Sequence, residues 1–142
     1  MSSRVVTLAV FVAFTVACIV QNAVAMSAEL RIYKEPEFKR LRQIIPFSAG
    51  NLCYDMPCSF LSDITSSARW SGIPVAGSAF ADGQVKIAFY ADNNCTGRAV
   101  VVNASVGQIC DFAAFGMDKA TSSFAVLETS TVMEHKTNNV CD

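Results

Sequence analysis

The chain contains two copies of one pattern, and this duplication restricts the fold more than any other feature. Residues 30–53 align with residues 87–110 without a gap, and the matched pairs include Tyr33 with Tyr90 and Cys53 with Cys110. Further along, residues 60–70 and 115–126 each contain a phenylalanine, an aspartate three positions later and a Thr-Ser-Ser run. Self-similarity of this kind indicates an internal duplication, in which each copy forms one supersecondary unit.

Each copy predicts four short β-strands. In the second copy, Ile87 and Phe89 alternate with smaller or polar residues, a β-branched run follows at 100–102, and an apolar strand begins after the double serine. Two four-stranded units with one apolar face each are expected to pack as an all-β sandwich. The predicted domain spans 26–127, with repeats at about 30–70 and 87–127, a Gly/Pro/Ser-rich connector at 71–86 and a polar tail at 128–142.

The N-terminus is typical of a secretory signal peptide. Arg4 is followed by an uncharged apolar run at 5–20, and Ala23 and Ala25 form the small-x-small pattern that signal peptidase accepts. The apolar run is shorter than a membrane-spanning helix requires. We therefore expect cleavage after Ala25, a secreted mature chain and no membrane contact after cleavage.

The charge of the chain does not favour a nucleic-acid partner. Its formal net charge is −1, and removal of Arg4 with the leader makes it one unit more negative. A balance of this sign provides no overall attraction for nucleic acid or an anionic membrane.

The second copy resembles the βγ-crystallin type of Greek key. That motif has an aromatic residue, six intervening residues, a glycine, and a serine at the start of the last strand, and here these are Tyr90, Gly97 and the pair Ser122 and Ser123. The resemblance implies a folded hairpin with the glycine at positive φ and a serine hydroxyl tying the hairpin down. The first copy departs from the motif because Arg40 replaces the glycine, so its hairpin is expected to be either reshaped or strained.

The same resemblance implies possible calcium sites, since many members of the family bind this ion through oxygen ligands at the start of the last strand. The candidate ligands are Ser62, Asp63, Ser66, Asp118 and Thr121. Each copy lacks one of the two acidic or amide residues of the motif, so we expect a structural serine corner with no metal or other cofactor.

Six cysteines are present, and five remain after removal of the leader that holds Cys18. An oxidising compartment favours two disulfides and one remaining thiol, but the number of possible pairings is large. The repeat alignment favours Cys95–Cys110 and Cys53–Cys58, which leaves Cys141 free or available to link two chains into a dimer. The alternative pairing is Cys58–Cys141.

Two glycosylation sequons are present, at Asn94 (Asn-Cys-Thr) and at Asn103 (Asn-Ala-Ser). A disulfide at Cys95 would restrict access to Asn94, so occupancy is expected at Asn103 more than at Asn94.

No motif indicates an enzyme. The one histidine, His135, lies in the polar tail, and no GxSxG or HExxH pattern is present. The Lys-Arg-Leu-Arg run at 39–42 resembles the Arg-x-Leu-Arg tag of oomycete host-translocated effectors, but the repeat alignment places it at the turn and second strand of the first copy. We expect a secreted, non-enzymatic interaction protein with an extracellular protein or glycan target. Resemblance to small secreted proteins of oomycete plant pathogens implies an apoplastic effector, toxin or inhibitor. The alternative is a calcium-stabilised structural or stress-related protein.

Overall fold

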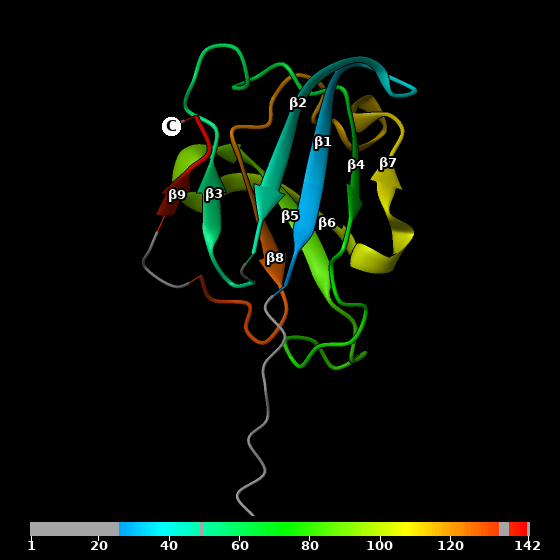
Figure 1. Ribbon diagram of the computed structural model, residues 1–142, viewed down its shortest axis with the longest axis vertical. Helices are drawn as coiled ribbons and strands as arrows, with labels where there is room; N and C mark the ends of the chain where they lie inside the picture. The colour runs from blue at the N-terminus through cyan, green and yellow to red at the C-terminus, as the bar shows by residue number, and fades with distance from the viewer. Residues whose placement is uncertain (1–25, 49, 134–136, 142) are drawn as a thin grey trace, which may run out of the picture.

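Two β-sheets face each other across an apolar core in the computed structural model, which describes residues 26–48, 50–133 and 137–141 (Figure 1). The predicted leader at 1–25 and His135 lie outside the described residues. The strands are β1 (Ala28–Glu35), β2 (Lys39–Phe47), β3 (Cys53–Asp55), β4 (Ser67–Ser71), β5 (Lys86–Asp92), β6 (Thr96–Asn103), β7 (Gln108–Ile109), β8 (Ser123–Leu127) and β9 (Thr137–Asn139). Three short 3₁₀ turns complete the elements, η1 (Asn93–Cys95), η2 (Ala104–Val106) and η3 (Phe112–Phe115).

The two copies exchange their third strands between the sheets. Sheet A has the order β2-β1-β4-β7, and sheet B has the order β6-β5-β8-β3-β9. Strand β3 belongs to the first copy but pairs with β8, and β7 belongs to the second copy but pairs with β4. The predicted fold class, two four-stranded Greek-key units in a βγ-crystallin-like sandwich, is confirmed, and β9 adds a strand to sheet B.

The alternation of side chains along β1 and β5 builds the core. Leu30 and Ile32 are fully buried on the inner side of sheet A, and Ile87 and Phe89 are fully buried on the inner side of sheet B. Aromatic rings from both sheets meet between them; Phe47 of β2 packs against Phe124 of β8 with ring centroids 5.4 Å apart. Both copies therefore supply one continuous core rather than two separate ones.

The connector and the tail have defined structure in the described residues. Within the connector, Ala76 pairs with Gln84 in an isolated bridge, and Phe80 packs with the tail residue Met133 against the small cluster Ala88, Ala125 and Leu127. Beyond it, β9 pairs in parallel with β3 (Figure 1). Part of the polar tail thus belongs to the sandwich, and Phe80 and Met133 cover part of the outer face of sheet B.

The disulfides correct the favoured pairing. Cys53 bonds to Cys95 and Cys58 bonds to Cys141, so the local pairs Cys95–Cys110 and Cys53–Cys58 are wrong, and the alternative Cys58–Cys141 is confirmed. The cause is the exchange of third strands: β3 carries Cys53 into sheet B, beside the β5–β6 hairpin that holds Cys95, while Cys110 follows β7 in sheet A.

The thiol left over is Cys110, which is exposed. A covalent dimer through Cys141 is therefore wrong for this oxidised state, because that sulfur is already bonded within the chain. Two disulfides indicate an oxidising compartment. Among the described residues, no helix is long and apolar enough to cross a membrane.

Candidate functional site

The hairpin between β5 and β6 has the geometry that the crystallin-like motif implies. Gly97 has φ +76°, and a Cβ at this position would collide with the Asp92 carboxylate. The Ser123 hydroxyl donates to the Asp92 carbonyl oxygen at 2.6 Å and accepts from the Cys95 N–H at 3.1 Å. Ser123 is thus the serine that ties this hairpin down, whereas Ser122 bonds elsewhere. Partial burial raises the pKa of the motif aromatic, Tyr90.

The first copy keeps the same folded hairpin despite its arginine. The Ser67 hydroxyl donates to the Glu35 carbonyl oxygen at 2.6 Å and accepts from the Phe38 N–H at 3.1 Å, which repeats the bonds of Ser123. Arg40 has φ +57° and so adopts the left-handed conformation itself. The hairpin is therefore strained at Arg40 rather than reshaped.

The calcium candidates are divided between two places related by the repeat. The Asp63 N–H donates to the Thr121 carbonyl, and the Lys119 N–H donates to the Thr65 carbonyl, so Lys119 is the structural counterpart of Asp63. A lysine therefore stands at the second acidic position of the second copy. Asp118 is exposed.

The cleft beside Asp63 has too much positive charge for a calcium ion. It has a volume of about 330 Å³ and is lined by Lys34, Glu35, Arg40, Asp63, Ile64 and Lys119. Asp63 accepts from the Ser122 hydroxyl at 3.2 Å, and Ser122 also contacts the Ser62 hydroxyl. Three orphaned oxygens are nearby in sequence, because the buried hydroxyls of Thr65, Ser66 and Thr121 have no hydrogen-bond partner among the described residues. Hard oxygen ligands are thus present, but three cationic side chains against two carboxylates do not fit a dication.

The two sequon asparagines differ in exposure. Asn94 lies in η1 and is exposed, although its side chain accepts a 3.3 Å hydrogen bond from Thr137 of β9. Asn103 ends β6 and is half-buried. Cys95 is bonded to Cys53, but Asn94 is nevertheless exposed, so exposure favours Asn94 over Asn103. The run at 39–42 lies in β2, as the repeat alignment predicts.

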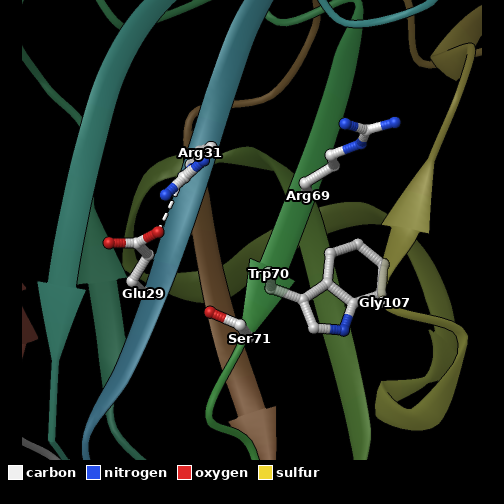
Figure 2. Close-up of a pocket in the computed structure, with 6 residues that line it drawn as sticks. All are labelled: Glu29, Arg31, Arg69, Trp70, Ser71 and Gly107. Atoms are coloured by element: carbon white, nitrogen blue, oxygen red, sulfur yellow. Dashed lines mark hydrogen bonds and ion pairs between the residues drawn. The ribbon is translucent and has the colours of Figure 1, made fainter.

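A depression on the outer face of sheet A brings together residues that the sequence did not single out. It has a volume of about 310 Å³ and is lined by Glu29, Arg31, Arg69, Trp70, Ser71 and Gly107 (Figure 2). We call it the sheet A depression. In the antiparallel register of β1 and β4, Arg31 lies directly opposite Arg69, and Glu29 lies directly opposite Ser71. Four polar side chains therefore form a two-by-two array on one face.

The two guanidinium groups of this array are not equivalent. Arg31 forms an ion pair with Glu29 at 2.6 Å, and this carboxylate raises the pKa of Arg31. Arg69 is exposed and lies with its guanidinium carbon 3.6 Å from the centre of the Phe38 ring. In the part of the chain that the structure describes, the side chain of Arg69 forms no hydrogen bond or ion pair. Its donors are therefore available to a ligand while the aromatic contact holds the group in place.

The two arginine side chains of the array point in opposite directions, Arg31 to its ion pair with Glu29 and Arg69 to the ring of Phe38. Figure 2 shows the Arg31 side chain turned toward Glu29 and the Arg69 side chain turned the opposite way along the strands. Like charges directly opposite on neighbouring strands repel and destabilise the sheet. Arg31 already has Glu29 beside it, so the place where a negative group would lower the electrostatic energy is beside Arg69.

The floor of the depression is fixed by Trp70. Its indole N–H donates to the Ala104 carbonyl at 2.7 Å, and its own backbone N–H donates to the Gly107 carbonyl at 3.0 Å. Gly107 has φ +75°, and the nearest atom to an added Cβ would be 3.9 Å away, so the backbone here is open to an approaching group. The sequence did contain part of the signal, since alternation along β1 places Glu29 and Arg31 on the outer side. The opposition of Arg31 and Arg69, however, depends on a register that composition does not specify.

Comparisons with known proteins concern the fold. No protein-family model matches the chain, and no curated protein matches it. Among solved structures, it is similar to a chain from work on the evolution of the eye lens βγ-crystallin domain fold, with 22% identity over 70% of this chain and 85% of that chain, TM-score 0.47. It is also similar to the N-terminal domain of protein S (14% identity, 70% and 96% coverage, TM-score 0.45). A third similar structure is a βγ-crystallin from an archaeon (22% identity, 70% and 96% coverage, TM-score 0.44).

Proposed function

We propose that the protein is a secreted, non-enzymatic interaction protein that binds an extracellular target through the outer face of sheet A. The observation that carries the proposal is the exposed guanidinium of Arg69, held on Phe38 with no anionic partner in the described chain. An arginine fixed by an aromatic ring, with its donors unpaired, is typical of a recognition site.

The contrast between the two outer faces supports this choice of surface. Phe80 and Met133 pack on the outer side of sheet B, where Ala88, Ala125 and Leu127 are buried beneath them. On sheet A, the outward residues Arg31 and Arg69 are exposed. The repeat would give the two sheets equivalent outer faces, so the uncovered face of sheet A is where a partner can bind.

The compartment and the finer role are part of the same proposal. Two disulfides and the N-terminal pattern at 1–25 support secretion. Within this role, an apoplastic effector, toxin or inhibitor is the form that we favour, acting by occupying a target rather than by chemistry. Glycosylation at Asn94 or Asn103 would leave the proposed face free, since both residues belong to the β5–β6 hairpin of sheet B or its end.

The test is retention of native extracellular material on the immobilised, oxidised protein. Three proteins are compared: the natural chain, the Arg31→Gln/Arg69→Gln double variant, and a control with Lys86→Gln and Arg98→Gln on sheet B. We expect the natural chain and the control to retain the same material and the sheet A variant to lose it. Equal retention by all three proteins would contradict the assignment of the face.

A second measurement addresses the calcium-stabilised alternative. The melting temperature is followed with calcium and with a chelator. Because the cleft beside Asp63 contains Lys34, Arg40 and Lys119, we expect no calcium-dependent shift. An increase of several degrees, together with no retained material, would replace our proposal with the structural role.

A further inference from the structure

The four side chains of the sheet A depression differ in the groups that they offer to a ligand. Arg31 and Arg69 offer donors with positive charge, Glu29 offers an acceptor with negative charge, and Ser71 offers a hydroxyl. A ligand that fits all of them carries an anionic group and hydroxyl donors within one small unit. This requirement is the basis of the inference, which depends on the proposed function and specifies its ligand.

We infer that the sheet A depression binds a uronic acid residue of an acidic extracellular polysaccharide. The carboxylate accepts hydrogen bonds from the free donors of Arg69, while the ring hydroxyls donate to Glu29 and contact Ser71. Planar guanidinium groups match the two oxygens of a carboxylate well. A negative charge beside Arg69 also reduces the repulsion between Arg69 and Arg31 on the neighbouring strand.

The size and shape of the depression favour one sugar ring over a protein segment. Its volume of about 310 Å³ is at the lower end of the ~300–1,000 Å³ that small-molecule sites occupy. The open backbone at Gly107 forms a shallow floor on which the carbon-bound face of a ring can lie.

Charge favours a uronate over denser anions. Glu29 lies within the site and is exposed on one side, with 35% of its side chain accessible. A nucleic-acid backbone or a run of acidic peptide residues brings several negative charges close to this carboxylate, and the net charge of the chain, −1, adds to the repulsion. Sugar hydroxyls, in contrast, can donate to Glu29. An acidic peptide is the competing ligand class.

The experiment measures binding of the oxidised, full-length secreted chain to de-esterified polygalacturonate by titration calorimetry, in the presence of a chelator so that calcium cannot bridge. Fully methyl-esterified polygalacturonate has the same backbone without the charge, and poly-glutamate has the charge without the sugar. The variants are Arg69→Gln and Arg31→Gln. Arg98→Gln is the matched control, because Arg98 is an exposed arginine on β6 of the other sheet whose guanidinium donates to the Gly116 carbonyl.

We expect binding to the de-esterified polymer, a loss of affinity of about tenfold or more in Arg69→Gln, a smaller loss in Arg31→Gln, and a change below about twofold in Arg98→Gln. All variants should melt within a few degrees of the natural chain. Equal binding of the methyl ester, or an equal loss in Arg98→Gln, overturns the inference. Equal binding of poly-glutamate that depends on Arg69 also overturns it and assigns an acidic peptide instead.

Failure of the ligand class and failure of the proposed face give different results. Native extracellular material that is retained through Arg31 and Arg69, with no affinity for polygalacturonate, overturns the uronate and leaves the face in place. Retention that does not depend on Arg31 and Arg69 contradicts the assignment of the outer face of sheet A, whether or not the chain binds polygalacturonate.

Discussion

The two hairpins place one arginine and one glycine in the same backbone conformation. Arg40 has φ +57° and Gly97 has φ +76°, and both lie in hairpins tied by an equivalent serine. Left-handed φ costs a residue with a Cβ roughly 1–2 kcal/mol. The strain at Arg40 is therefore compensated by other contacts, including the two hydrogen bonds of Ser67.

Substitutions at these two positions should change the free energy of unfolding in opposite directions. Arg40→Gly removes the strain but makes the unfolded chain more flexible, so we expect the free energy of unfolding to rise by about 0.5 kcal/mol. Gly97→Ala introduces strain and a collision with Asp92, and we expect a loss of about 1–3 kcal/mol. Urea unfolding of the oxidised protein measures both. Arg40→Gly also removes the ion pair with Glu35, but this pair is too exposed for its loss to outweigh the expected rise in the free energy of unfolding. A lower free energy of unfolding in both variants would contradict this account.

At the scale of the elements, the Cys58–Cys141 disulfide should hold β9 on sheet B. Strand β9 has three residues and, among the strands in the described part of the chain, pairs with β3 alone, so it gains little from its own hydrogen bonds. With Cys58→Ser and Cys141→Ser together, we expect a loss of about 2–4 kcal/mol and fast hydrogen exchange at the Val140 amide, which donates to the Asp55 carbonyl at 2.9 Å.

The control for this element is Cys110→Ser. This thiol is exposed and unbonded, so its replacement should leave the exchange at Val140 and the unfolding free energy unchanged within about 0.5 kcal/mol. Alkylation of the folded, unreduced protein should label Cys110 alone. Labelling of Cys141 in that experiment would contradict the disulfides described here.

The sequence predicted the strands well, but it did not predict which distant segments lie next to each other. The strands and the folded hairpins followed from local patterns, such as the alternation at Ile87 and Phe89 and the spacing from Tyr90 to Gly97. The disulfides were predicted wrongly because a repeat alignment matches Cys53 with Cys110 but does not show that β3 and β7 exchange sheets. The sheet A depression was missed for a related reason. Residues 31 and 69 become neighbours only through the β1–β4 register, which depends on long-range pairing rather than on local pattern.

For the whole molecule, the exchange of β3 and β7 makes the two copies one folding unit. Without the second copy, sheet A would lack its edge strand β7. Strand β3 would also lack both of its neighbours, β8 and β9. The stacked rings of Tyr54 and Phe124 also come from different copies. Separate halves would therefore expose apolar surface, and neither is expected to fold alone.

Both disulfides also join the copies, because each links a cysteine before the connector to one after it. The connector turn at Gly83 is exposed, and nothing lies within 4 Å of a Cβ added there, so a protease site inserted at this turn should be cut without disturbing the fold. We expect the nicked protein to run as one band without reductant and as two bands with it, and to keep its melting temperature within a few degrees until it is reduced. Reduction should then unfold the nicked protein at a lower temperature than the reduced intact chain, since only the intact chain keeps its halves at high effective concentration. An intact chain without the inserted site, treated with the same protease, is the control. Two bands without reductant would mean that the disulfides lie within the copies, and the exchange of strands between the sheets would then lose its covalent support.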